Sequence, residues 1–468
     1  MRLSFFGACR QITGSCYLLE TDNLKILVDC GMYQEREFQV RNWKPFPFSP
    51  QEIDYLVLTH VHLDHSGLIP KLVKEGFSGK ILMTYPSLDL LPILLLDSAR
   101  IQEEDAAYKK KRHKKENRSG PYPVVPIYTV DDAKACIPLF QSVPYGQEYK
   151  LSPELKVCFH DAGHILGSSM PEFILNRNGQ TQTVVFSGDI GQWDKPLIKD
   201  PTVFDRADHV VMESLYGDRK HEDPKDVGEM LSTIIKETVA VNGNVLIPTF
   251  AIERAQELLF HLNHLVWTDQ IPYMMMFLDS PMAVDATDVF LRHRDSLDKE
   301  TQALFKDGRS PFHFPGLKLI RSVAESKAIN NIRGSCIIMA GSGMCTGGRI
   351  KHHLKQNIFR EESTLLFVGY QAHGTLGRHI LEGNDRVRIH GQSYEVNSRI
   401  EAIHGFSAHA DQDGLLKWLS KMEAGPKNIF LTHGDLDSAT YLAENIRRTK
   451  GWKSQIPEYL ETYELRLE

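Results

Sequence analysis

Short hydrophobic runs alternate with polar loops through the first two hundred residues of the chain. Runs of this length, bounded by turn-forming residues, are typical of buried β-strands. The predicted strands are residues 24–28, 55–58, 80–83, 155–159, 183–186 and 209–212. Between the third and fourth of these runs the sequence predicts a helix at 87–102, then a charge-dense stretch and a proline-rich segment at 120–126.

From about residue 218 the pattern changes to longer helices that alternate with strands. The predicted helices are 225–241, 252–264 and one that begins near 348, and the predicted strands are 244–248, 273–278, 335–340 and 364–369. Alternation of this kind favours a parallel sheet flanked by helices. Shorter strands return near the end of the chain, where a strand at 428–431 precedes a helix at 439–448.

The composition is that of an ordinary globular protein. A chain of 468 residues exceeds the size at which one hydrophobic core keeps growing, so we expect two or more domains. The hydrophobic content of 42% and the charged content of 24% are unremarkable for a soluble fold. The net charge of −6 argues against a generally basic nucleic-acid binder, but it leaves room for a local basic groove.

The seven cysteines are scattered, odd in number and form no CxxC pair. This favours a reducing compartment and argues against both a disulfide framework and a thiolate zinc site. A glycine at position 7 comes too early for the hydrophobic part of a signal peptide. The longest apolar stretch, 88–96, is interrupted by Asp89 and Pro92 and is too short to span a bilayer. We therefore expect a cytoplasmic protein.

The residues after the predicted strand at 55–58 carry the strongest chemical signal. Four potential metal ligands crowd into this short segment: His60, His62, Asp64 and His65. Zinc is bound by neutral imidazole and carboxylate groups, and a hydrolytic site keeps one coordination position open. The ligands follow the carboxyl end of a strand, where α/β proteins place their chemistry. The sequence therefore predicts a catalytic metal site here.

Three further residues repeat this placement on loops that leave a strand. They are His164, Asp189 and His433, which follow the strands at 155–159, 183–186 and 428–431. Each is weak evidence alone, because a single histidine beside a glycine is usually an ordinary loop residue. The repetition of one geometry indicates that they complete the same metal site.

In this order, the ligands resemble those of the metallo-β-lactamase superfamily, whose fold is an αββα sandwich. The resemblance implies two Zn²⁺ ions per chain. One ion would be held by His60, His62 and His164, and the second by Asp64, His65 and His433, with Asp189 bridging the two. Asp29 matches an early aspartate motif of the family and would orient a ligating histidine.

The segment between Asp189 and His433 is far longer than one β/α unit requires, so a whole domain must be inserted there. This resembles the β-CASP branch, in which an α/β cap domain interrupts the lactamase fold. Its motifs A, B and C match Glu213, His409 and His433. We expect a lactamase domain at 1–217, the β-CASP domain at 218–390 and the C-terminal part of the lactamase domain at 391–468.

A histidine at motif C is typical of RNA-acting members of the branch, similar to the cleavage-and-polyadenylation endonuclease. The resemblance implies a zinc-dependent ribonuclease of RNA processing or decay, either an endonuclease or also a 5′-3′ exonuclease. Asp189 would help to accept the proton of the attacking water. His409, oriented by Glu213, would protonate the leaving 3′ oxygen, which gives 5′-phosphate and 3′-hydroxyl products.

The expected partner is single-stranded RNA, threaded between the two domains, and a homodimer is compatible with the sequence. The glycine-rich loop 341–348 precedes a basic helix, and the start of a helix favours a phosphate. The candidate substrate contacts are Ser342, Gly343, Arg254, Arg378 and Ser407. A plain loop before an exposed basic helix explains the pattern almost as well. The basic run from Lys109 to Lys115 is flanked by acidic residues, which favours a solvated helix face over an RNA contact.

Two alternatives remain open at this point. The first is a small-molecule hydrolase on the same dinuclear zinc site, such as a thioesterase of the glyoxalase II kind. The inserted domain argues against it, because a domain over the metals suits a threaded strand. The second is an inactive scaffold, and the complete set of ligands argues against that.

Overall fold

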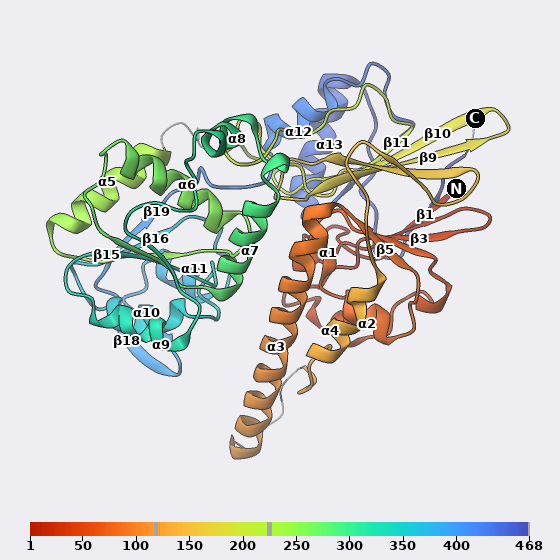
Figure 1. Cartoon of the computed structure of the whole chain (residues 1–468). Coiled ribbons are helices and arrows are strands. Elements are labelled where there is room, and N and C mark those ends of the chain that lie inside the picture. The colour runs from red at the N-terminus through yellow and green to blue at the C-terminus, as the bar shows by residue number, and fades with distance from the viewer. Residues whose placement is uncertain (117–119, 121, 222–226, 467–468) are drawn as a thin grey trace. The chain divides into compact units, whose positions relative to one another are not determined.

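The computed structural model describes residues 1–116, 120, 122–221 and 227–466, which form two compact units. The first unit comprises Met1–Asp194, Asp200–Lys220 and His409–Glu468, and the second comprises Lys195–Lys199 and His221–Ala408. Both units are drawn in Figure 1. Residues 391–408 group with the second unit. The domain borders expected after residues 217 and 390 stay predictions.

Two sheets form the centre of the first unit. In the described residues the first sheet has seven strands, in the order β21 (Thr462–Glu464), β1 (Arg2–Phe5), β2 (Tyr17–Glu20), β3 (Lys25–Val28), β4 (Tyr55–Val57), β5 (Lys80–Met83) and β6 (Phe140–Ser142). The second has six, in the order β20 (Asn428–Thr432), β11 (His209–Glu213), β10 (Gln180–Phe186), β9 (Ser169–Arg177), β8 (Leu155–Asp161) and β7 (Glu148–Lys150). Strands β3 to β6 are parallel, as are β10, β11 and β20.

The inner faces of the two sheets share one hydrophobic core. Phe5 of β1 and Phe430 of β20 contact each other with ring centroids 5.2 Å apart, and Phe173 and Phe186 extend the aromatic cluster. Alternate side chains of a strand point to opposite faces, so one set of residues reaches this core. Apolar burial of this kind is the main favourable contribution to folding.

Helices cover the outer faces of the sandwich. They are α1 (Leu63–Ser66), α2 (Ile69–Lys74), α3 (Tyr85–Glu116), α4 (Val130–Cys136), α12 (Gln412–Leu419) and α13 (Leu436–Lys450). Trp418 of α12 and Leu442 of α13 are fully buried against Met212 and Leu431 of the second sheet. The layered arrangement confirms the predicted αββα sandwich.

The second unit is built on a parallel sheet. Among its described residues the strand order is β14 (Leu317–Leu319), β13 (Met275–Leu278), β15 (Cys336–Ala340), β12 (Val245–Pro248), β16 (Thr364–Phe367) and β19 (Arg399–Ala402). All neighbouring pairs in this sheet are parallel. A separate hairpin joins β17 (Arg386–Ile389) to β18 (Gln392–Glu395). The predicted parallel sheet is confirmed.

Helices connect these parallel strands. They are α5 (Val227–Ala240), α6 (Arg254–Trp267), α7 (Pro281–Arg292), α8 (Lys299–Lys306), α9 (Val323–Ala328), α10 (Ile350–Asn357) and α11 (Leu376–Leu381). Because the strands are parallel, the loops that follow β12, β13, β15 and β16 lie at one edge of the sheet. The first two residues of the helix predicted at 225–241 lie outside the described residues.

The helix predicted at 87–102 proved much longer. Helix α3 continues to Glu116 and includes both the charge-dense stretch and the basic run (Figure 1). The alanine, glutamate and lysine residues of this extension are strong helix formers. Lysines near the end of a helix also interact favourably with its dipole. Pro92 lies inside α3.

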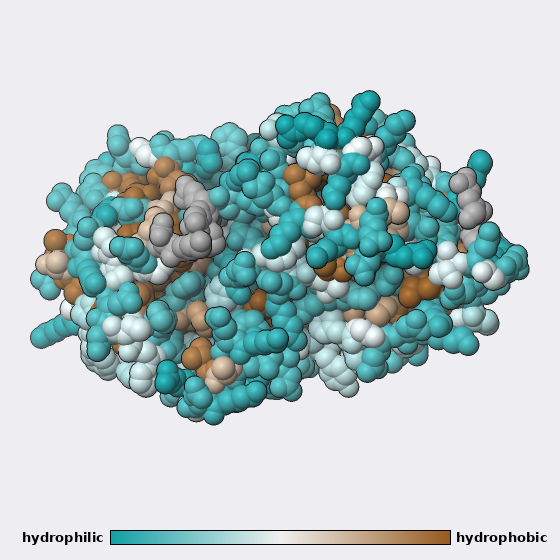
Figure 2. Space-filling view, turned by 90° about the horizontal axis from the view of Figure 1, so that it is seen from above, coloured by the Kyte–Doolittle hydropathy of each residue, from teal (hydrophilic) through white to brown (hydrophobic). Residues whose placement is uncertain are grey.

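The face seen in Figure 2 is mainly hydrophilic, with separate small hydrophobic areas. Scattered exposed apolar side chains are normal on globular proteins. Within the described ranges, each helix is too short or too polar to cross a membrane.

A buried charged cluster organises the loop edge of the second unit. Asp279 follows β13, is fully buried and accepts hydrogen bonds from Arg349 (2.6 Å), His353 (2.6 Å) and Ser326. Burial opposes ionisation, but these hydrogen bonds outweigh it and hold the pKa of Asp279 below its usual value. The cluster therefore ties α9 and α10 to the end of a central strand.

We expect Asp279→Asn to destabilise the second unit by about 3 kcal/mol, because it leaves the buried His353 and the partly buried Arg349 without their shared carboxylate. The folded-state pKa of Asp279 is depressed, so its contribution is present at neutral pH. It is lost only as the pH falls below about 4. Urea unfolding followed by circular dichroism at several pH values measures this difference.

Asp285→Asn is the matched control. Asp285 forms an exposed ion pair with Arg321, and such pairs contribute less than about 1 kcal/mol. Equal effects of the two substitutions would contradict the role given to the buried cluster.

Candidate metal centre

Asp29 holds the ligand loop that follows β4. Its Oδ1 accepts the backbone N–H of Thr59 at 2.8 Å, and its Oδ2 accepts the Thr59 hydroxyl at 2.8 Å. The same Oδ2 lies 2.7 Å from Nδ1 of His65. One buried carboxylate therefore fixes both the start of the loop and the orientation of a histidine further along it.

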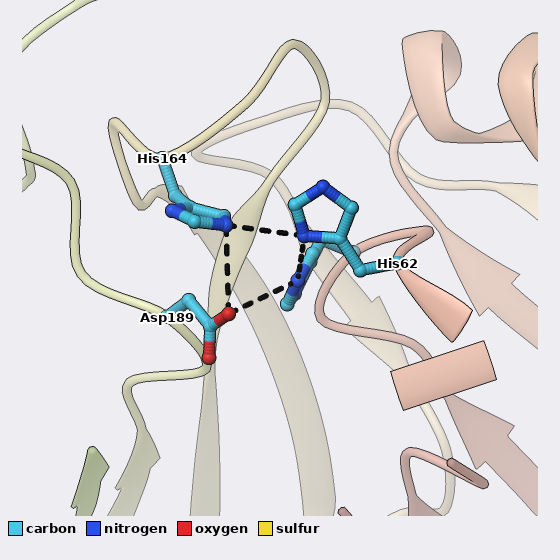
Figure 3. Close-up of side chains that lie close together, drawn as sticks. His62, His164 and Asp189 are labelled. Atoms are coloured by element: carbon cyan, nitrogen blue, oxygen red, sulfur yellow. Dashed lines mark hydrogen bonds and ion pairs between the residues drawn. The ribbon is translucent and has the colours of Figure 1, made fainter. Parts of the chain in front are cut away.

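Four of the predicted ligands form a first group, made by His60, His62, His164 and Asp189. Their ligand atoms all lie within 4.8 Å of one another. Nδ1 of His62 is 3.1 Å from Nε2 of His60 and 3.2 Å from Nε2 of His164. Oδ2 of Asp189 is 3.3 Å and 3.4 Å from the same two Nε2 atoms. Figure 3 shows the labelled side chains pointing toward one another.

Burial keeps these imidazoles neutral. Burial and the nearby His60 lower the pKa of His62 to about 3. Burial and His409 lower the pKa of His164 well below its usual value. Neutral imidazole is the form that binds a metal ion.

The second group joins Asp64, His65 and His433, whose ligand atoms also lie within 4.8 Å of one another. Nε2 of His65 is 3.2 Å from Oδ1 of Asp189, and Nε2 of His433 is 3.5 Å from the same oxygen. Asp189 therefore turns one oxygen to each group. Burial opposes protonation of His65, but Asp189 and Asp29 outweigh it and raise the pKa of His65 well above its usual value.

The residues fit a metal centre on their chemistry. Oδ1 of Asp189 is buried, and no residue in the described part of the chain donates a well-aligned hydrogen bond to it, although Nε2 of His65 lies 3.2 Å away. A buried carboxylate without such bonds needs positive charge nearby. Where two imidazole nitrogens face each other without a proton, both are hydrogen-bond acceptors and cannot bond to each other. A proton or a cation between them removes this conflict. Imidazole and carboxylate donors in this ratio suit zinc.

Glu213 and His409 form a pair beside the two groups. Nδ1 of His409 lies 3.2 Å from Oε2 of Glu213, which is 1% exposed. Burial alone would lower the pKa of His409, but Glu213 and Asp189 outweigh it and raise the pKa to about 9. His409 also belongs to a third group of possible ligands, with Asp189 and His433. Its geometry is therefore compatible with proton transfer and with metal binding.

The five predicted substrate contacts lie in the second unit. There, Arg254 donates a hydrogen bond to the carbonyl of Val368, and Arg378 pairs with Glu382 at 2.7 Å. The Ser342 hydroxyl accepts the N–H of Gly347 inside the glycine-rich loop. These intramolecular contacts use some of the hydrogen-bonding groups of Arg254, Arg378 and Ser342. The role of all five residues in substrate binding, Gly343 and Ser407 included, stays a prediction.

Sequence reasoning missed the role of Thr59. Its hydroxyl donates to Asp29 and lies 3.1 Å from Nδ1 of His60, so it links the aspartate to a second histidine. No spacing pattern marks such a contact, because a threonine before a ligand cluster is common in any loop.

Three family models match the chain. The metallo-beta-lactamase superfamily matches residues 10–85, the Beta-Casp domain matches 255–380, and the Zn-dependent metallo-hydrolase RNA specificity domain matches 393–457. The three matches follow one another along the chain without overlap.

Individual relatives cover most of the chain. Ribonuclease TTHA0252 of Thermus thermophilus is 37% identical over 435 residues, which are 93% of each chain. Transcription termination factor FttA of Methanosarcina mazei is 32% identical over 99% of this chain and 72% of its own length. A solved protein of unknown function from Enterococcus faecalis has a TM-score of 0.53 at 11% identity and is covered over 99% of its length. This last likeness concerns the fold alone.

We expect Asp29→Asn to weaken metal binding about 10- to 100-fold, because the amide cannot accept from both Thr59 and His65 as the carboxylate does. Competition with a chelator, followed by metal analysis of the protein, measures this loss. Asp54→Asn is the control, since Asp54 is exposed beside the same strand and, among the described residues, accepts a backbone N–H from Lys25 alone. Unchanged metal affinity in the Asp29 variant would show that Asp29 does not orient a ligand.

Proposed function

Because this chain belongs to the metallo-β-lactamase superfamily, in its β-CASP branch, we propose that it is a metal-dependent ribonuclease that hydrolyses phosphodiester bonds of RNA. The observation that carries this proposal is the convergence of two ligand groups on one bridging carboxylate, Asp189. The similarity of this chain to a ribonuclease over nearly its whole length supports RNA as the substrate.

Two zinc ions per chain are the proposed cofactors. His60, His62 and His164 would hold one, Asp64, His65 and His433 the other, and Asp189 would contact both. Such a pair of cations supplies a water nucleophile at neutral pH and neutralises charge on the phosphoryl oxygens.

Protein side chains account for the proton movements. The Asp189 carboxylate lies between the two groups, where it can accept the proton of the attacking water. His409 is held by Glu213 and keeps its proton near neutral pH, so it can donate to the leaving 3′ oxygen. The proposed products are a 5′-phosphate and a 3′-hydroxyl.

The alternative of a small-molecule thioester hydrolase is not favoured. The same metal centre would serve it, but a match to an RNA specificity domain and to the Beta-Casp domain covers much of residues 255–457. These two matches therefore favour RNA over a small molecule as the substrate.

Several finer points belong to the proposal. Cleavage within RNA or from its 5′ end, passage of a single strand between the domains and a homodimer stay predictions. A reducing compartment such as the cytoplasm agrees with the seven free, buried cysteines.

The first test is cleavage of a structured RNA and its DNA counterpart, each labelled at the 3′ end, by zinc-loaded protein. We expect discrete long fragments from RNA alone, which identify an endonuclease. Progressive shortening of the labelled strand would instead identify 5′-3′ exonuclease action.

The double variant His60→Ala, His65→Ala is the control and should cut neither substrate. If the unchanged protein binds its metals and still cuts neither nucleic acid, the ribonuclease proposal is wrong. Hydrolysis of thioesters would then be tested next.

We expect His409→Ala to lower kcat on ordinary RNA by about 10²- to 10⁴-fold, since the leaving oxygen loses its proton donor. RNA with sulfur in place of the bridging 3′ oxygen needs no such proton, so the loss on that substrate should be under about tenfold. Steady-state kinetics on both substrates and zinc analysis of the variant separate the two possible roles. An equal loss on both substrates, or loss of zinc, would assign His409 to the metal site instead.

A further inference from the structure

Two exposed aromatic rings lie on neighbouring loops of the second unit. Phe250 follows β12 and is 42% exposed, and Tyr370 follows β16 and is 63% exposed. Strands β12 and β16 are paired and parallel, so both residues leave the same edge of the sheet.

The backbone is shaped to carry the Phe250 ring. A Cβ on Gly343 would lie 2.7 Å from this ring, which is closer than Cβ atoms approach other atoms in proteins. A Cβ on Gly369 would lie 3.8 Å from it, at ordinary contact distance. The Phe250 ring therefore packs against glycine backbone from two loops, and one of these glycines, Gly369, directly precedes Tyr370.

Buried polar contacts hold these loops together. The side-chain amide of Gln371 is 2% exposed and donates to the carbonyls of Gly343 and Gly369, each at 3.0 Å. Arg254 donates to the carbonyl of Val368 at the end of β16. Hydrogen bonds therefore hold the loops beneath the two rings in place, while the rings themselves stay exposed.

We propose that Phe250 and Tyr370 form a stacking platform for unpaired nucleobases of the RNA substrate. This inference rests on the proposed ribonuclease function and names how that function holds its substrate. Exposed aromatic rings on a fixed support are what single-stranded nucleic acids require, because every base has a face that can stack. The contact is independent of base identity, so the platform positions the strand without demanding a sequence.

Tyr273 provides a matched control within the same unit. It is 76% exposed, but it precedes β13, so it lies at the amino ends of the parallel strands. Phe250 and Tyr370 lie at the carboxyl ends. Tyr273→Leu therefore removes an exposed ring from the opposite edge of the same sheet.

The test is steady-state cleavage of a single-stranded RNA oligonucleotide with one cleavage site. We expect Phe250→Leu and Tyr370→Leu each to raise KM about tenfold, with kcat little changed, because leucine keeps bulk but offers no stacking face. Gly343→Ala should raise KM in the same way by displacing the Phe250 ring. Tyr273→Leu should leave both constants unchanged.

A second measurement connects the rings to bases. Each nucleotide of the oligonucleotide is replaced in turn by an abasic ribose. At one or two positions this replacement should raise the KM of the unchanged protein about tenfold. The KM of Phe250→Leu or Tyr370→Leu is already raised, and at those positions the replacement should raise it little further. If the two effects on KM multiplied at every abasic position, the proposal would be overturned, because the substituted ring and the removed base would then not contact each other.

The outcomes distinguish this inference from the proposed function. If the protein cuts RNA but the two leucine variants behave like Tyr273→Leu, the stacking platform is wrong and the ribonuclease stands. If the unchanged protein cuts no RNA, the proposed function fails and the platform fails with it.

Discussion

The buried carboxylate of Asp189 is the constraint on which the metal centre depends. A charge removed from water is tolerated only when opposite charges and hydrogen bonds compensate it. Here four histidines approach its two oxygens within 3.5 Å: His60, His65, His164 and His433. None of these rings neighbours Asp189 in sequence, so the compensation exists only when the whole first unit is folded. Stability and metal binding are therefore properties of the same set of contacts.

Both sheets of the sandwich contribute to that set. The loop with His60 follows β4 of the first sheet, whereas Asp189 and His433 follow β10 and β20 of the second. Their relative position is set by the packing of the inner faces, including the contact of Phe5 with Phe430. Interiors of this density transmit small shifts instead of absorbing them. Core substitutions far from the ligands can therefore disturb the metal centre.

Sequence patterns predicted the parts of this protein that depend on local order. Ligands at strand ends, such as His164 after β8, follow from a hydrophobic run and the residue types behind it. Contacts between distant segments left no such trace. Asp279 meets groups on two helices and Gln371 joins two loops, and no spacing pattern in the sequence predicts either set of contacts. The end of α3 was misjudged because its charge obscured its strong helix propensity.

The position of the second unit within the chain has a consequence for synthesis. Strand β20, which leads to His433, and strand β21, which pairs with β1, both come after that unit in the chain. A ribosome adds residues from the amino end at about 5–20 per second, and domains fold as they emerge. The nascent first unit must therefore wait, with one edge of each sheet unpaired, until the second unit has been made. Only then does the last imidazole arrive, so an incomplete chain carries an incomplete metal centre.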